Sequence, residues 1–519
     1  MKRGDVSPAP SSGSRLASPT AEAGIFRRSV WLRRAAIVGL FALGLAIRLI
    51  DLTEPPLDFH PMRQLRGALI ARGVYYRLLP EADPEVRNKA MALAGVDSPQ
   101  EPPLLDSLVG LTYLVVGGER LWVARLYSIA FWLAAGYFLY RLALRMAGAD
   151  GAVVALAYFL VIPLGVYVSR SFQPDSLMVL LLIASIAAAH RWVETRSWKW
   201  AVLTGLAVGG VALVKARPAL IVGPMVVAAV LSAKPLRRAV RDPQVWAMGA
   251  LAVVPAAIYY LGVIGPSTSG YLSEYAVGAW GLLLDPQFYF RWMIMVDRVA
   301  LLGFAAVGLV AMWLLPRPGR GLVVGLWIGY GLYGLALPYT IVTHNYYSIA
   351  LVPIVALSLA PLAMLLFGAL ARQPWHGRTV ALVVFAGLLA YRTWFTRSTL
   401  LDTDYRPEPL GWIAMGRALP EDGAIIGLTH DYGLRVAYYG WRQVTPWPGA
   451  ADLELARIEG RSAEPPDLEE ILRRVQGYRY FLVTLFGEVD GQPDLKTFLE
   501  QRPVAAEAPG FVLYDLASP

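Results

Sequence analysis

The stretch PPLDFHPMRQLRGALIARG, residues 55–73, comes directly after the first apolar segment of the chain. Asp58 lies seven residues past Asp51, where the apolar run ends, and His60 and Arg63 follow closely. Acid, imidazole and guanidinium groups are costly to keep at the edge of a bilayer unless they have a function. The stretch therefore predicts a functional site at a membrane surface, with Asp58 as the candidate catalytic carboxylate.

The composition predicts a polytopic α-helical membrane protein. Of 519 residues, 56% are hydrophobic and only 16% are charged, which excludes an ordinary soluble domain. The absence of cysteine excludes disulfides, thiol nucleophiles and cysteine-based metal sites. The net charge of +9 comes mainly from short segments between apolar runs, as membrane orientation requires. Membrane lipids are therefore expected partners, and nucleic acid is not.

The order of apolar and polar segments predicts three regions. Residues 1–34, rich in Ser, Pro and basic side chains, are expected to form a disordered cytoplasmic tail. Residues 35–397 should form the transmembrane domain, in which a first outer loop covers residues 52–120, and residues 398–519 a soluble extracytoplasmic domain. About 11 transmembrane helices are expected, at about 35–50, 121–144, 152–168, 174–190, 200–214, 218–233, 244–264, 299–315, 321–338, 347–369 and 379–395.

Charge sets the expected orientation of these spans. Every even-numbered connection carries Arg or Lys, which marks it as cytoplasmic. The odd number of spans then places the C-terminal domain on the outer side, in the compartment that Asp58 faces. We expect a multi-pass protein of a bacterial inner (plasma) membrane with a cytoplasmic N-terminus.

Two outer regions have recognisable local structure. Residues 63–76 and 103–116 of the first outer loop predict amphipathic helices in the plane of the membrane surface. After residue 398, short strands are expected at 424–428, 480–486 and 511–515, with helices at 468–475 and near 410–419, which together predict a small α/β domain. His430-Asp431 follows the first of these strands and is interpreted as a strand-end turn rather than a site.

Longer motifs carry a resemblance to a known family. The stretch at 55–73, followed by QEPPLLDSLVGLTYLVVGGERLWVARLYS at 100–128, resembles the first outer loop of GT-C glycosyltransferases. This group includes the protein O-mannosyltransferases and the bacterial aminoarabinose transferase, and HPMRQ with ALIARG resembles its bacterial family 39-like members. Further matches are SRSFQPDSLMVLL at 169–181, LVKARPALIVGP at 213–224 and HNYYSIALVPIVAL at 344–357.

The resemblance implies transfer of a sugar from a polyprenyl-phosphate donor to an acceptor hydroxyl on the outer face. Asp58 would act as the general base, and a single displacement would invert the anomeric configuration. The acceptor could be a lipid, a glycan or a protein. A transporter or flippase of a lipid-linked sugar and a non-enzymatic envelope assembly subunit remain alternatives. A transporter should carry central charges and inverted repeats, and the sequence has neither.

Outward-facing polar residues are the candidate substrate contacts. Positive charge is rare in short outer loops, and guanidinium and ammonium groups bind phosphate, although such side chains also extend to lipid headgroups. Asp175 is expected to pair with Arg170, to orient the acceptor, or simply to begin a helix. Glu101 stands where the aminoarabinose transferase has Lys. The expected substrate-binding residues are His60, Arg63, Gln64, Glu101, Arg170, Asp175, Lys215, Arg217, His344, Tyr346 and Tyr347.

No cofactor is expected. Asp58, His60 and Glu101 could supply oxygen and nitrogen ligands to a divalent metal, but they follow no preset helical spacing. Metal is therefore a minor alternative.

Overall fold

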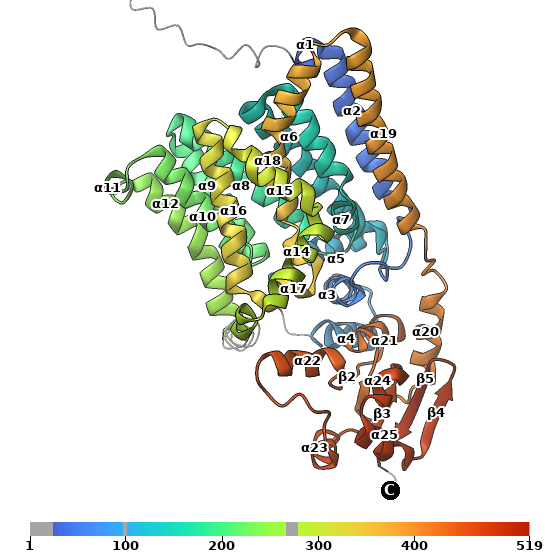
Figure 1. Ribbon diagram of the computed structural model, residues 1–519. Coiled ribbons are helices and arrows are strands. Elements are labelled where there is room, and N and C mark those ends of the chain that lie inside the picture. The colour runs from blue at the N-terminus through green and yellow to red at the C-terminus, as the bar shows by residue number, and fades with distance from the viewer. Residues whose placement is uncertain (1–23, 97–100, 266–278, 518–519) are drawn as a thin grey trace, which may run out of the picture.

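The computed structural model describes residues 24–96, 101–265 and 279–517. The first part is a helical domain that extends to residue 400, and the second is a C-terminal domain (Figure 1). Residues 1–23 of the predicted tail lie outside the described residues. Residues 25–34, predicted to be disordered, are helical, with Ile25 and Phe26 buried. The prediction fails here because Ile25 and Phe26 are apolar and are buried against the helical domain.

The long apolar helices form the body of the helical domain, and shorter helices connect them. The bounds of the long and short helices are α1 (Ile25–Arg28), α2 (Val30–Arg48), α6 (Trp122–Val161), α7 (Pro163–Val168), α8 (Asp175–Thr195), α9 (Trp198–Val214), α10 (Ala219–Ala233), α11 (Leu236–Ala239), α12 (Pro243–Ala257) with η2 (Ile258–Ile264), η4 (Trp280–Leu284), α14 (Pro286–Ala300), α15 (Leu302–Ala311) with η5 (Met312–Leu314), α16 (Arg317–Ala336), α17 (Pro338–Thr343), η6 (Asn345–Ser348), α18 (Leu351–Leu370) and α19 (Trp375–Leu400).

Among the described residues, six helices are long and apolar enough to cross a membrane: α2, α6, α8, α12 with η2, α18 and α19. A seventh is added if α14 and α15, which meet at 88°, count as one span. Each predicted segment coincides largely with helix, and two of them merge into α6, which kinks at Ala147 and Gly148. These findings support a multi-pass helical membrane fold, and the count of eleven stays a prediction.

Close helix packing depends on glycine in α16. A Cβ at Gly329 would lie 2.3 Å from the carbonyl oxygen of Ile221, and one at Gly325 would lie 2.8 Å from that of Pro224. Glycine at these two positions therefore lets α16 approach the backbone of α10, as small residues do between membrane helices.

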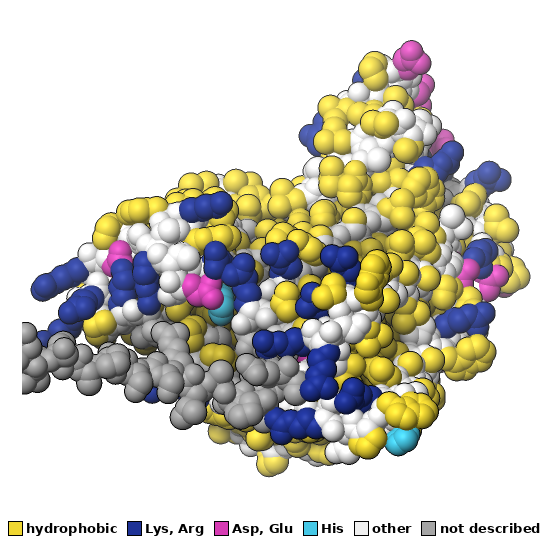
Figure 2. All heavy atoms as spheres, turned by 90° about the horizontal axis from the view of Figure 1, so that it is seen from above, with side chains coloured by type: hydrophobic (Ala, Val, Ile, Leu, Met, Phe, Trp, Pro, Cys, Tyr) yellow, Lys and Arg dark blue, Asp and Glu magenta, His cyan; other side chains and the backbone are white. Residues whose placement is uncertain are grey.

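Basic side chains gather on the face of the helical domain that is farthest from the C-terminal domain (Figure 2). The exposed Arg and Lys residues of the predicted cytoplasmic connections are Arg141, Arg145, Lys199, Arg237, Arg238, Arg241, Arg317 and Arg372. This distribution is the one that the positive-inside rule expects of a cytoplasmic face.

The first outer loop holds three helices: α3 (Pro61–Leu78), α4 (Pro84–Ala94) and α5 (Leu104–Val116). The sequence predicted two of them and missed α4, which Asp83 caps. The apolar side chains Leu65, Leu69 and Tyr75 of α3 are buried in a cluster that includes residues of the C-terminal domain. The orientation of α3 in the plane of the membrane surface stays a prediction. Figure 1 shows α3 and α4 between the long helices and that domain.

The C-terminal domain contains a five-stranded mixed sheet of order β2-β1-β3-β5-β4. Strand β1 pairs in parallel with β2 and β3, and β5 pairs antiparallel with β3 and β4. Three of the strands and two of the helices lie where the sequence predicted them. The bounds are α20 (Glu408–Ala418), β1 (Ile425–Leu428), η7 (His430–Gly433), α21 (Leu434–Gly440), β2 (Thr445–Pro446), α22 (Ala450–Ile458), α23 (Leu468–Arg474), β3 (Tyr480–Val483), α24 (Phe486–Asp490), α25 (Pro493–Glu500), β4 (Val504–Ala508) and β5 (Phe511–Asp515).

Candidate functional site

Asp58 lies in the turn between α2 and α3, and its carboxylate is held by three side chains. Oδ1 accepts from Gln64 Nε2 at 3.2 Å and from Arg125 Nη2 at 3.3 Å, and Oδ2 accepts from Arg170 Nη1 at 3.0 Å. The side chains of Arg125 and Arg170 are 2% and 1% exposed, whereas that of Asp58 is 15% exposed. A carboxylate has about four acceptor positions, so one remains for another proton donor.

The two arginines also fix the backbone of the turn. Arg125 donates to the carbonyl oxygens of Asp51 and Leu52, and Arg170 donates to those of Ile50 and Asp51. We name this group the Asp58 turn: Asp58, Gln64, Arg125 and Arg170. The sequence analysis missed Arg125, although a charge in the first turn of the apolar helix α6 was a visible signal.

A second group lies beside the first turn of α3. Lys215 Nζ donates to both carboxylate oxygens of Asp175 at 2.8 Å and lies 5.1 Å from the centre of the Tyr346 ring. The guanidinium of Arg217 lies 4.4 Å from the centre of the Tyr347 ring. These contacts combine residues from three separate segments of the chain: the start of α8, the connection between α9 and α10, and η6.

Histidines complete this second group. His60 Nε2 is 3.1 Å from Asn345 Oδ1, and the His60 ring centre lies 4.6 Å from that of Tyr346 and 5.4 Å from that of His344. Arg63 forms an ion pair with Glu101. We name the whole group the cation–aromatic cluster: His60, Arg63, Glu101, Asp175, Lys215, Arg217, His344, Asn345, Tyr346 and Tyr347.

The first turn of α3 connects the two groups. His60, with a positive φ of 47°, precedes Pro61 at the start of the helix. Gln64 then reaches the Asp58 turn, while Arg63 reaches Glu101. The sequence predicted this gathering, but it grouped Arg170 with the cations of the cluster. Arg170 instead binds Asp58, and the predicted Arg170–Asp175 pair is replaced, among the described residues, by Lys215–Asp175.

Burial and neighbouring charges shift several pKa values in the cluster. Burial, together with the positive charges of nearby basic groups, lowers the pKa of His344 to about 4, and burial also lowers that of His60. Burial alone would raise the pKa of Glu101, but the charges of Arg63, Lys215 and Arg66 outweigh it and hold that pKa below its usual range. At neutral pH the positive charge of the cluster therefore comes from Arg and Lys, not from histidine.

Tyr347 and Asp106 respond to the same surroundings in opposite ways. Burial would raise the pKa of Tyr347, but Arg217 and Arg63 outweigh it and lower the pKa. Asp106, on α5, was not selected from the sequence. Burial and the negative charge of Glu101 raise the pKa of Asp106 to about 7. It titrates in the range in which an acid–base group is useful.

The described residues contain no group of three or more His, Asp or Glu side chains arranged to hold a metal ion. Two of the proposed ligands have other partners, since Asp58 binds arginines and Glu101 binds Arg63.

His430 lies far along the chain in the C-terminal domain, where its Nδ1 is 2.9 Å from Thr484 Oγ1 at a strand end, as the sequence interpretation expected.

Comparison with known proteins identifies similar folds. Residues 100–260 match the family of dolichyl-phosphate-mannose-protein mannosyltransferases. ArnT from Cupriavidus metallidurans, in its apo state, is similar over 92% of this chain and 97% of its own, with 15% identity and a TM-score of 0.52. AglB from Archaeoglobus fulgidus, an archaeal oligosaccharyltransferase solved with an inhibitory peptide and a dolichol-phosphate, is similar over 89% of this chain and 70% of its own, with 10% identity and a TM-score of 0.52. No curated protein sequence matches the chain.

The resemblance inferred from the sequence motifs is thereby confirmed. The fold is that of ArnT and AglB, as the resemblance to GT-C glycosyltransferases predicted, and residues 100–260 match the protein mannosyltransferase family. The matched segment contains Glu101, Arg125 and Arg170, so it includes the two arginines that bind Asp58 and the carboxylate that pairs with Arg63.

Proposed function

We propose that the chain is a membrane glycosyltransferase that moves a sugar from a polyprenyl-phosphate donor to an acceptor hydroxyl on the outer face. One observation carries the proposal: Arg63, Lys215 and Arg217 gather with aromatic and imidazole side chains beside the turn that holds Asp58. The dolichol-phosphate in the AglB structure supports this class of donor.

The proposed reaction is a single displacement. The acceptor oxygen bonds to the anomeric carbon, the bond from that carbon to the phosphate oxygen breaks, and polyprenyl phosphate leaves. Asp58 takes the proton of the acceptor hydroxyl through the acceptor position that its three partners leave open. Such a displacement inverts the anomeric configuration.

The cation–aromatic cluster would act on the phosphate. Fixed cations stabilise negative charge that develops on a leaving phosphate, and they act most strongly where water is partly excluded. Arg217 can grip phosphate oxygens through two N–H groups, whereas Lys215 acts as a point charge. The tyrosines and the neutral imidazoles of His60 and His344 can form hydrogen bonds to sugar hydroxyls.

The test uses purified full-length protein in lipid vesicles with a polyprenyl-phosphate sugar and candidate acceptors from the cell envelope. Release of polyprenyl phosphate together with a glycosylated product supports the proposal, and Asp58→Asn should abolish this turnover while His430→Ala should keep it. Translocation of the sugar lipid without transfer would instead identify a flippase. Mass spectrometry of envelope glycolipids and glycoproteins from a deletion strain would identify the acceptor.

A further inference from the structure

The C-terminal domain contacts the polypeptide on both sides of Asp58. On the N-terminal side, the backbone N–H of Tyr405 donates to Glu54 Oε1 at 3.0 Å, and Arg406 forms an ion pair with Asp51. Glu54 is only 2% exposed. This contact holds the start of the turn that Arg125 and Arg170 fix from the other side.

The second contact is at Arg72, in the C-terminal half of α3. Arg72 Nε is 3.0 Å from both carboxylate oxygens of Glu119, and Nη1 donates to the carbonyl oxygen of Tyr438 at 2.7 Å. The guanidinium centre lies 4.0 Å from the Tyr438 ring and 4.2 Å from the Trp441 ring. Tyr438 OH also donates to Glu119 Oε2 at 3.2 Å. The residues Arg72, Glu119, Tyr438 and Trp441 form what we call the Arg72 clamp.

The Arg72 clamp ends a strained segment of the C-terminal domain. Asp431, Tyr432 and Trp441 have φ values of 49°, 56° and 52°, a left-handed conformation that side-chain-bearing residues seldom adopt. Such strain persists only where surrounding contacts enforce it. Here η7 and α21 pack against α3, and Leu434 and Ala437 join the buried cluster of Leu65 and Leu69.

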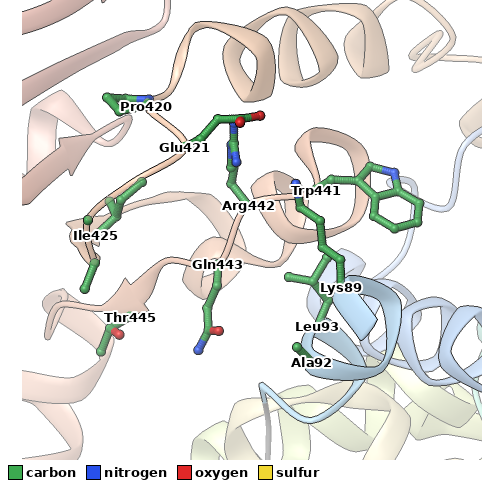
Figure 3. Close-up of a pocket in the computed structure, with 12 residues that line it drawn as sticks. Lys89, Ala92, Leu93, Pro420, Glu421, Ile425, Trp441, Arg442, Gln443 and Thr445 are labelled. Atoms are coloured by element: carbon green, nitrogen blue, oxygen red, sulfur yellow. The ribbon is translucent and has the colours of Figure 1, made fainter. Parts of the chain in front are cut away.

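Beside this packed region, α4 and the C-terminal domain border a pocket. Between α4 and the C-terminal domain lies a cavity of about 360 Å³, and Figure 3 shows Lys89 and Leu93 of α4 on one side of it and Arg442 and Gln443 on the other. The Arg72 clamp supplies polar contacts that fix α3 to the C-terminal domain, in addition to the apolar packing of Leu434 and Ala437.

We propose that Arg72 is a positioning residue through which the C-terminal domain braces α3 and, with it, the catalytic turn. Arg72 and Gln64 are eight residues apart on one helix, about 12 Å at 1.5 Å per residue, so a shift at the Arg72 clamp moves Gln64 and Arg63 together. The inference rests on the proposed function for its effect on catalysis, but the bracing itself can be measured without turnover.

The experiment compares Arg72→Lys and Arg72→Gln with the wild-type protein in lipid nanodiscs. Lysine keeps the charge but loses the planar guanidinium whose Nε binds Glu119 while Nη1 binds the carbonyl oxygen of Tyr438. We therefore expect kcat to fall about tenfold in Arg72→Lys and further in Arg72→Gln. The KM for a polyprenyl-phosphate sugar should change less than twofold. Arg479→Lys is the matched control, because Arg479 forms an exposed ion pair with Asp422 within the C-terminal domain, and it should behave as wild type.

Amide hydrogen exchange supplies the second readout. Residues 55–70 should exchange at least tenfold faster in the Arg72 variants, while α8 and α18 keep wild-type protection. Glu119→Gln is a milder change that replaces the Arg72 variants if these fail to fold. It should give a smaller increase in the exchange rate of residues 55–70. Wild-type exchange at 55–70, or a rise in KM with unchanged kcat, would overturn the inference. If the wild-type protein transfers no sugar, the proposed function fails, while the exchange data still decide whether the brace exists.

Discussion

The Asp58 turn and the cation–aromatic cluster share the first turn of α3 but are built differently. In the Asp58 turn, two nearly inaccessible guanidinium groups hold one carboxylate, and both also bind backbone carbonyl oxygens. In the cluster, cations lie against carboxylates, tyrosines and imidazoles drawn from several loops. The first arrangement fixes the position of a single group, whereas the second offers several cationic and hydrogen-bonding groups to a ligand. This difference fits the proposed division of roles, in which the Asp58 turn accepts the proton and the cation–aromatic cluster binds the donor.

Replacing Asp58 should give the largest effect. Asp58→Asn keeps the size of the side chain but removes its proton-accepting charge, so transfer should fall by about 10²- to 10⁴-fold. The change also leaves two buried guanidinium groups without a counter-charge, which should lower the free energy of unfolding by about 3–5 kcal/mol. Turnover is measured with a polyprenyl-phosphate sugar, and binding with undecaprenyl phosphate as the probe.

The binding measurement decides between a chemical and a structural role for Asp58. Undecaprenyl phosphate should bind the Asp58→Asn variant within a few-fold of its wild-type affinity, because the cation–aromatic cluster is intact. Equal losses of binding and transfer would show that Asp58 only supports the fold, and the division between the two groups would then be wrong.

Replacing Arg217 tests the other side of the comparison. Arg217→Gln removes a cation and should raise the donor KM about tenfold or more, since a hydrogen bond to a charged group is worth about 1.5–3 kcal/mol. The donor KM of Arg217→Lys should lie between that of the wild-type protein and that of Arg217→Gln. The control is Arg77→Gln, an exposed arginine in the last turn of α3, which should leave the KM unchanged. An unchanged KM in Arg217→Gln would mean that Arg217 packs against Tyr347 without binding the donor.

The sequence predicted the membrane class and that most of the cluster residues gather beside Asp58, because charge near an apolar boundary is visible in one dimension. The catalytic role of Asp58 stays a prediction. It did not predict which carboxylate each cation meets. Lys215 and Arg170 both follow apolar helices, and only the tertiary fold decides that Arg170 binds Asp58 while Lys215 binds Asp175. Arg125 was overlooked for the same reason, since its partners lie 67 to 74 residues earlier in the chain.

The C-terminal domain shows another limit of sequence analysis. Alternation of apolar residues gave the strands near 425, 480 and 511, whereas β2 contains two residues and β4 is mostly exposed, so neither has an apolar pattern. The Arg72 clamp depends on two rings from α21 and the residue after it, which only the tertiary fold brings to α3.

Asp106 provides a pH-dependent test of the cluster. Its pKa of about 7 lies above the ordinary 3.8, so the folded protein keeps a proton that the unfolded chain has released. The contribution of Asp106 to the free energy of unfolding should therefore be complete below pH 3.8, and it should be lost as the pH rises through 7. Asp106→Asn should flatten that part of the profile in thermal unfolding between pH 5 and 8. A parallel profile for the variant would show that Asp106 is solvated.

His344 should give the smallest effect, with the opposite sign. Its pKa of about 4 lies below the ordinary 6.5, so between these values the unfolded chain binds a proton that the folded protein does not. The stability contributed by neutral His344 is complete above pH 6.5 and is lost as the pH falls through 4. His344→Asn should remove this acid-side decline in thermal unfolding between pH 4 and 7, while exposed His376→Asn should not. Because His344 is already neutral at pH 7, transfer at pH 7 should change only a few-fold. A large loss of transfer at pH 7 would instead assign His344 to the chemical step. The division of roles between the cluster and the Asp58 turn would then be wrong.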